Sequence, residues 1–353
     1  MFSYFPLTRL FISISLPHDL RVSQTEKSSN IDLQPRYFGR EKSRTRTDRL
    51  FSGTVIVAAL SSLFILTAIL IYLAGSSWPI LQKEGLSFVT GSNWVGGLDD
   101  PTLAEYQIWP MLYGTLLNSI LAIIFAVPIS VLLAVFIVFI APKMVAKGLT
   151  IAIDILAAIP SGIIGLWGFL VFTSVGEGWS KLLNQYLGFL PIFVNDQEQF
   201  QRSPFITAWV LGIMIVPIIT VVAREVLAQT PQYLLDAARG LGGSLWGTVK
   251  MVALPYARGG IVGGVMLGLG RALGETVAIY FVLNLIFERV NYYKILEPEG
   301  GSVASMIIAK FGEATPDEIQ ALLGAGLVLF LLTLVVNLIA NWIVARSTKG
   351  EYV

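Results

Sequence analysis

Arg271 and Glu275 are the strongly charged residues of this sequence that lie deep in a long apolar stretch, Gly259–Phe287. Their i,i+4 spacing places both side chains on one face of a helix, where a guanidinium and a carboxylate can pair. An arginine at the centre of a bilayer costs at least about 2.5–3.5 kcal/mol on insertion scales, so it must face protein, water or a substrate path. An arginine offset by a glutamate suits the passage of an anion. The alternative is a structural ion pair that locks the helices together.

The residue types exclude most enzymatic chemistry. The chain has no Cys and a single His, His18, in a polar N-terminal segment. Thiolate zinc sites, cysteine nucleophiles, multi-histidine metal sites and Ser/His/Asp triads are therefore excluded. No Gly-x-x-x-x-Gly-Lys-Ser/Thr loop occurs, so we expect no cofactor in this chain, and any ATP that drives it must bind another chain. No basic block outside the N-terminal segment suggests nucleic-acid binding.

The composition and the apolar runs predict an all-α integral membrane protein. Of the 353 residues, 55% are hydrophobic and only 13% are charged, whereas soluble domains are about 25% charged. Six segments are long enough to cross a bilayer as helices, which takes about 17–25 residues. Pro128, Pro160 and Pro217 fall within the second, third and fourth segments, where kinks are expected. The six segments are Phe51–Leu73, Leu112–Ile140, Leu149–Val175, Phe205–Val222, Gly259–Phe287 and Ile319–Ala345.

The distribution of Lys and Arg predicts the orientation of these spans. The N-terminal segment, the even-numbered connections and the C-terminus carry 17 of the 24 Lys and Arg residues, and the odd-numbered connections carry 6. The positive-inside rule then places both termini in the cytoplasm. We therefore divide the chain into a cytoplasmic basic tail, residues 1–50, which we expect to be disordered, and a membrane domain, residues 51–353.

The cytoplasmic connection between the fourth and fifth spans, residues 223–258, has the pattern of a helix–turn–helix rather than of a flexible linker. Thr230 is a good N-cap and Pro231 suits the first helical position, which predicts a short helix over Gln232–Arg239. Gly242 can end this helix, and Ser244 can cap a second short helix that runs toward Val252.

This connection also carries residues suited to contact with another protein. Asp236 offers a fixed charge, and Ala237 and Ala238 allow a partner to approach closely. A compact helical loop of this kind can transmit force as a rigid body. An ordinary interfacial helix is the alternative interpretation.

The spacing of these residues resembles a motif of ABC importers. Their membrane subunits carry Glu-Ala-Ala, three residues, Gly, nine residues and Ile-x-Leu-Pro. This chain reads Asp236-Ala237-Ala238, Gly242 and Val252-x-Leu254-Pro255, with Asp for Glu and Val for Ile. The resemblance implies that the loop couples the chain to cytoplasmic ATPase subunits, which bind the ATP and Mg. It also implies that Asp236 contacts the ATPase, that the alanines allow docking and that Gly242 makes the turn.

A second stretch, Gly263–Thr276, resembles the phosphate-specific ABC importer permeases, and Val277-Ala278 after it favours their C-type membrane subunit. The resemblance extends over residues 94–345 and leaves out residues 1–50. It implies a type I ABC importer permease (MetI-like) fold with six transmembrane helices in a bacterial inner membrane. Arg271 and Glu275 would line the phosphate path. The implied partners are an A-type permease, two ATPase subunits, an extracytoplasmic phosphate-binding protein and membrane lipid.

Several interpretations stay open. Asp154, inside the third span, could pair with an arginine of the partner permease or reach the interface as a snorkelling carboxylate. The substrate could be molybdate or sulfate instead of phosphate. An ion-driven secondary transporter predicts inverted repeats and broken helices around charges near the midplane, but the sequence has no convincing internal repeat. A purely structural membrane scaffold would not explain Arg271.

Overall fold

The computed structural model describes residues 46–96 and 104–348, and the predicted all-α architecture is confirmed there. The exception is a short antiparallel hairpin, β1 (Trp94–Val95) and β2 (Glu105–Tyr106), in which Trp94 lies opposite Tyr106. The chain divides into two units at Leu60. Most of the predicted basic tail lies outside the described residues. The described part of the first unit is the first portion of α1 (Arg46–Glu84).

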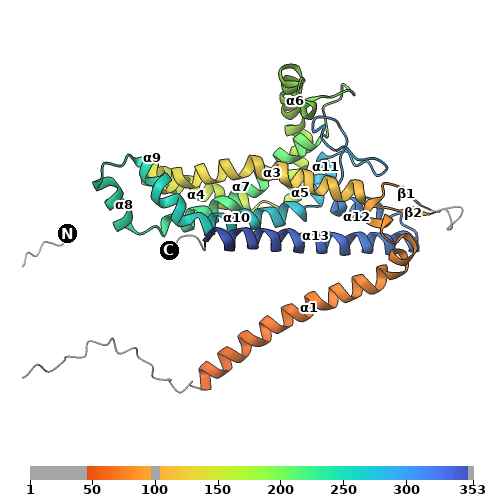
Figure 1. Ribbon diagram of the computed structural model, residues 1–353, viewed down its shortest axis with the longest axis horizontal. Helices are drawn as coiled ribbons and strands as arrows, with labels where there is room; N and C mark the ends of the chain where they lie inside the picture. The colour runs from red at the N-terminus through yellow and green to blue at the C-terminus, as the bar shows by residue number, and fades with distance from the viewer. Residues whose placement is uncertain (1–45, 97–103, 349–353) are drawn as a thin grey trace, which may run out of the picture. The chain divides into compact units, whose positions relative to one another are not determined.

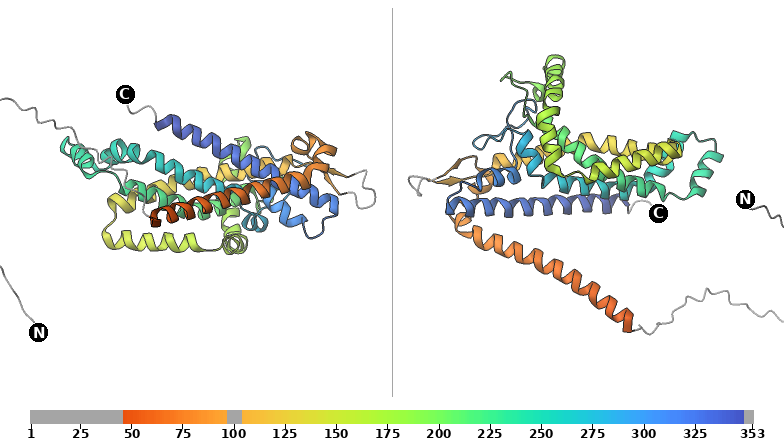
Figure 2. Two further views of the ribbon diagram at one scale, coloured as in Figure 1. Left: turned by 90° about the horizontal axis from the view of Figure 1, so that it is seen from below. Right: turned by 180° about the vertical axis from the view of Figure 1, so that it is seen from behind.

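The second unit holds the remaining elements. In Figures 1 and 2, α3, α7, α10 and α13 run along one another, with α8 at one end and the β1–β2 hairpin at the other. The elements after α1 are α2 (Ser87–Thr90), α3 (Trp109–Val135), η2 (Phe136–Ile140), α4 (Lys143–Ala158), α5 (Ser161–Trp167), η3 (Gly168–Phe172), α6 (Thr173–Leu187), η4 (Pro191–Phe193), α7 (Pro204–Ala228), α8 (Gln232–Gly240), α9 (Leu245–Thr248), η5 (Val249–Ala253), α10 (Leu254–Leu273), α11 (Val277–Val282), α12 (Val303–Lys310) and α13 (Pro316–Thr348).

Six helices of the described chain are long and apolar enough to cross a membrane, as the sequence predicts. The first, second, fourth and sixth predicted spans match α1, α3 with η2, α7 and α13. In α3 and α7 the predicted prolines, Pro128 and Pro217, lie inside the helix.

The third predicted span, Leu149–Val175, is wrong as a single helix. α4 ends at Ala158, Ile159 and Pro160 are extended, and a new helix begins at Ser161 and continues to Leu187. Proline lacks an N–H and disfavours the helical conformation in the residue before it, so the chain breaks rather than kinks. Beyond the break, α6 points away from the axis of α3 and α7 (Figures 1 and 2).

α7 is the central helix of the second unit, and about two-thirds of the residues in its most apolar stretch are buried. It packs most extensively against α3 and α10. Small residues make the contact with α10 close: a Cβ on Gly260 would lie 2.4 Å from Val226, and one on Gly268 would lie 2.9 Å from Ile219. These helices therefore form a tightly packed frame for the residues at the end of α10.

Candidate functional site

The fifth predicted span is broken at the point where its charged residues lie. Helical structure runs from Leu245 through η5 to Leu273, Gly274 caps α10, and α11 begins at Val277. The predicted continuous span Gly259–Phe287 is therefore wrong at both ends. The break places Arg271 in the last turn of α10 and Glu275 in the connection to α11.

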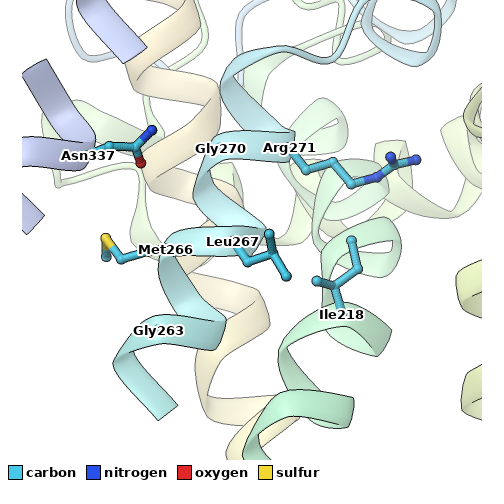
Figure 3. Close-up of a pocket in the computed structure, with 7 residues that line it drawn as sticks. All are labelled: Ile218, Gly263, Met266, Leu267, Gly270, Arg271 and Asn337. Carbon is cyan, nitrogen blue, oxygen red and sulfur yellow. The ribbon is translucent and has the colours of Figure 1, made fainter. Parts of the chain in front are cut away.

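Arg271 is exposed and lines a cavity of about 660 Å³. In Figure 3, its side chain extends from α10 on the side of Ile218, and Asn337 of α13 lies on the opposite side of α10. No carboxylate among the described residues forms a salt bridge with Arg271. An accessible guanidinium of this kind can bind an anion or a residue of another chain. The other lining residues are Gly263, Met266, Leu267 and Gly270.

Glu275 does not pair with Arg271, so the predicted i,i+4 ion pair is wrong. α10 ends between the two residues, so they do not share one face of a continuous helix. The Glu275 side chain is only 6% exposed, and its Oε1 accepts a hydrogen bond of 3.3 Å from the backbone N–H of Ala278. Glu275 therefore stabilises the first turn of α11, because a helix begins with unpaired N–H groups.

The glycines of α10 form two rows with different surroundings. Gly260, Gly264 and Gly268 pack against α7 of the same chain. Gly263 and Gly270 have nothing within 4 Å of a Cβ position, and both line the Arg271 cavity. The second row keeps the cavity open beside the guanidinium.

The predicted helix–turn–helix of the 223–258 loop is confirmed as α8, a turn and α9. Pro231, not Thr230, is the N-cap of α8, and the Thr230 Oγ1 is buried without a hydrogen-bond partner. Gly242 makes the turn with φ +87°, in the left-handed region that favours glycine. The Ser244 side chain accepts from the N–H of Gly247 at 3.1 Å, as its predicted capping role requires.

The loop presents an exposed surface on a buried anchor. Asp236 is exposed and lies 3.7 Å from Arg239, and Ala237 is exposed beside it. Leu241 is 91% exposed, whereas Leu235 is buried in a cluster with residues of α3 and α7. The anchor fixes the surface to the membrane helices. Ala238 is half-buried, and Leu254 and Pro255 begin α10.

Asp154 is exposed on α4, and none of the described residues forms a salt bridge with it. Its predicted pairing with another subunit stays a prediction. The sequence reasoning missed Asn337 as a lining residue of the Arg271 cavity. An amide within the apolar run of α13 is the signal that could have identified it.

Comparisons with known proteins agree with this arrangement. A family model described as "Binding-protein-dependent transport system inner membrane component" matches residues 112–349. The phosphate transport system permease protein PstC of Pasteurella multocida is 36% identical over 323 residues, covering 88% of this chain and 98% of the relative. The PstC protein of Haemophilus influenzae is 38% identical over 314 residues, covering 87% and 97%.

A solved structure shows the same fold. A chain of a bacterial alginate ABC transporter, in complex with an alginate pentasaccharide-bound periplasmic protein, matches with a TM-score of 0.53 and 17% sequence identity. The match covers 86% of this chain and 96% of the other chain. The predicted type I ABC importer permease fold is confirmed.

Proposed function

Because the chain belongs to the family of binding-protein-dependent transport system inner membrane components, we propose that it is the membrane-spanning permease subunit of an ATP-driven importer of inorganic phosphate. It is a multi-pass inner-membrane protein and a transport subunit without catalytic chemistry of its own. Both termini lie in the cytoplasm in this proposal, since most Lys and Arg residues fall on that side.

One observation carries the proposal: Arg271, an accessible arginine that forms no salt bridge with a described carboxylate, lies in the last turn of the helix that begins in the proposed cytoplasmic loop. Phosphate is an oxyanion, and a guanidinium matches its oxygens with paired N–H donors. Arg271 can therefore attract phosphate in the middle of the membrane. Glu275 acts by holding the start of α11 and by limiting the local positive charge.

The proposal includes the partners that the family resemblance implies. Two ATPase subunits, which hold the ATP and Mg, dock beneath the permease, one of them at the Asp236–Gly242 surface of this chain. An A-type permease completes the path, and an extracytoplasmic phosphate-binding protein delivers the substrate to the outer loops. ATP binding draws the ATPases together and opens the path outward, and hydrolysis returns it inward.

The test is phosphate uptake by proteoliposomes that contain the whole complex. We expect uptake that requires ATP, resists competition by sulfate and molybdate, and falls about ten- to a hundredfold in Arg271→Gln, because hydrogen bonds to charged groups contribute about 1.5–3 kcal/mol. Lys147→Gln, which removes an exposed charge from α4, is the matched control and should leave uptake unchanged.

Other outcomes identify the alternatives. Competition by sulfate or molybdate, with transport of that ion, would assign a different oxyanion. Uptake that requires an ion gradient but not ATP would indicate a secondary transporter. Normal uptake by Arg271→Gln would remove Arg271 from the path.

A further inference from the structure

A second cavity, of about 330 Å³, lies beyond the break between α10 and α11. Its walls come from η3, α11, α12 and the connections that precede α7 and follow α11. The proposed topology places these connections on the outer side of the membrane. The cavity is within the size range of small-molecule sites. Its lining includes Phe169, Arg202, Tyr280, Asn284, Phe287 and Ala309.

Arg202 is held firmly at this cavity. Its backbone has φ +54°, which is uncommon for a residue other than glycine and persists only where the surroundings enforce it. Its carbonyl accepts from the N–H of Asn284 at 3.0 Å, and its guanidinium Nη2 donates to the carbonyl of Leu283 at 3.0 Å. The arginine therefore joins the start of α7 to the end of α11.

The guanidinium keeps binding capacity after these contacts. The Arg202 Nε is buried and has no hydrogen-bond partner. A buried donor without an acceptor is uncommon in proteins and marks a place where a ligand can bind. Tyr280, whose phenol can also donate to an anion, lines the same cavity.

The charge at the cavity is positive. None of its lining residues is acidic. Lys310 Nζ lies 4.9 Å from the centroid of the Phe287 ring, and Phe287 is part of the wall. Neither Arg202 nor Lys310 forms a salt bridge within the part of the chain that the structure describes.

Other cations on the same side are neutralised by neighbours. Arg289 bridges Glu299, and Lys294 bridges both Asp196 and Glu297. The contrast matters because a cation already paired with a carboxylate has little affinity left for an anionic ligand. Arg202 and Lys310 keep that affinity: Arg202 lines the cavity, and Lys310 lies against Phe287 of its wall.

We infer that the Arg202 cavity is an outer binding site for the transported oxyanion, occupied before the ion reaches Arg271. This inference rests on the proposed function, and it adds a second site to the path. Two positively charged sites in series attract the anion inward and let it leave without being held in one deep well. Arg202 supplies the fixed charge, Lys310 adds charge beside Phe287, and Tyr280 supplies a neutral donor.

The charge of the wall can be changed without touching the contacts of Arg202. Ala309→Glu and Ala309→Gln introduce side chains of nearly equal size that differ in charge. We expect phosphate uptake by the reconstituted complex to be at least tenfold slower in the Glu variant than in the Gln variant, because a carboxylate repels the anion. Equal rates in the two variants would overturn the inference.

A second pair tests the charge of Lys310. Lys310→Arg keeps the charge and Lys310→Gln removes it, so phosphate uptake by the Gln variant should be at least threefold slower than uptake by the Arg variant. Stimulation of ATP hydrolysis by the phosphate-loaded binding protein should stay the same in all four variants. A parallel loss of that stimulation would assign the effect to docking and overturn the inference. Absence of phosphate uptake by the wild type would instead refute the proposed function.

Discussion

The turn at Gly242 gives a quantitative test of the coupling role proposed for the loop that holds α8 and α9, because only the backbone conformation of Gly242 demands glycine. A Cβ at Gly242 would meet nothing within 4 Å, so a larger residue fits sterically. Its φ of +87° is nevertheless costly for any residue with a Cβ, by about 1–2 kcal/mol. Since 1.4 kcal/mol is a factor of ten, Gly242→Ala should lower the population of the native turn about five- to thirtyfold relative to other loop conformations.

Gly240 provides the matched control. It lies two residues away at the end of α8, a Cβ there also meets nothing within 4 Å, and its φ is not positive. Gly240→Ala should therefore leave the turn intact, and it should favour the helix slightly. Gly242→Asn should fall between the two, because asparagine tolerates the left-handed region better than alanine.

The assay is the amount of ATPase that co-purifies with the permease, together with ATP-dependent uptake by the reconstituted complex. We expect Gly242→Ala to reduce both about tenfold, while membrane insertion of the permease is unchanged and Gly240→Ala behaves as wild type. ATPase association that is equal in Gly242→Ala and Gly240→Ala would refute the reasoning, because it would show that the geometry of this turn does not control docking.

Substitutions at Glu275, Asn195 and Lys294 test the packing of the site and of the loops before α7 and after α11. Glu275→Gln keeps a side-chain acceptor for the N–H of Ala278, so its melting temperature in detergent should match that of the wild type. Glu275→Ala removes the acceptor and should lower the free energy of unfolding by about 1–3 kcal/mol. Equal melting temperatures for the two variants would rule out the capping role of Glu275. Asn195→Ala removes donors to the carbonyls of Gln199 and Leu296 and should lower the unfolding free energy by about 1–3 kcal/mol. The control is Gln185→Ala, at an exposed position, which should change the unfolding free energy by no more than about 0.5 kcal/mol. Hydrogen bonds to Asp196 and Glu297 raise the pKa of Lys294, so the stability from this lysine is complete below its unfolded pKa of about 10.4 and is lost only as pH rises through the raised value. The difference in melting temperature between wild type and Lys294→Gln should therefore stay constant from pH 7 to pH 9; a difference that shrinks over this range would contradict the assignment.

The sequence was sufficient for features that depend on local rules. Length and apolarity identify α3, α7 and α13, because a membrane span must satisfy its backbone hydrogen bonds within one helix. Proline, glycine and serine at fixed offsets identify α8, its turn and α9, because each of these residues determines the backbone conformation or the capping at its own position. Only the N-cap of α8 was misplaced, by one residue.

Features that depend on distant contacts were beyond this reasoning. Spacing along a continuous helix pairs Glu275 with Arg271, but the break at Gly274 removes that geometry. The position of Arg202 depends on contacts with Leu283 and Asn284, about eighty residues away in the sequence. Pro160 did signal a disturbance, but the sequence could not distinguish a kink from a complete break.

The helix from Leu245 to Leu273 has 29 residues and is therefore about 43 Å long at about 1.5 Å per residue. One continuous helical stretch thus has the Gly242 turn near one end and Arg271 at the other, while Glu275 belongs to the adjoining segment, which packs against α5 and α12. A tilt of about 10° about the middle of such a rod would move each end by about 4 Å in opposite directions. If the stretch tilts as one body about the glycine row that packs against α7, a displacement at the Gly242 turn would change the separation of Arg271 and Glu275 directly, without a relay of side chains.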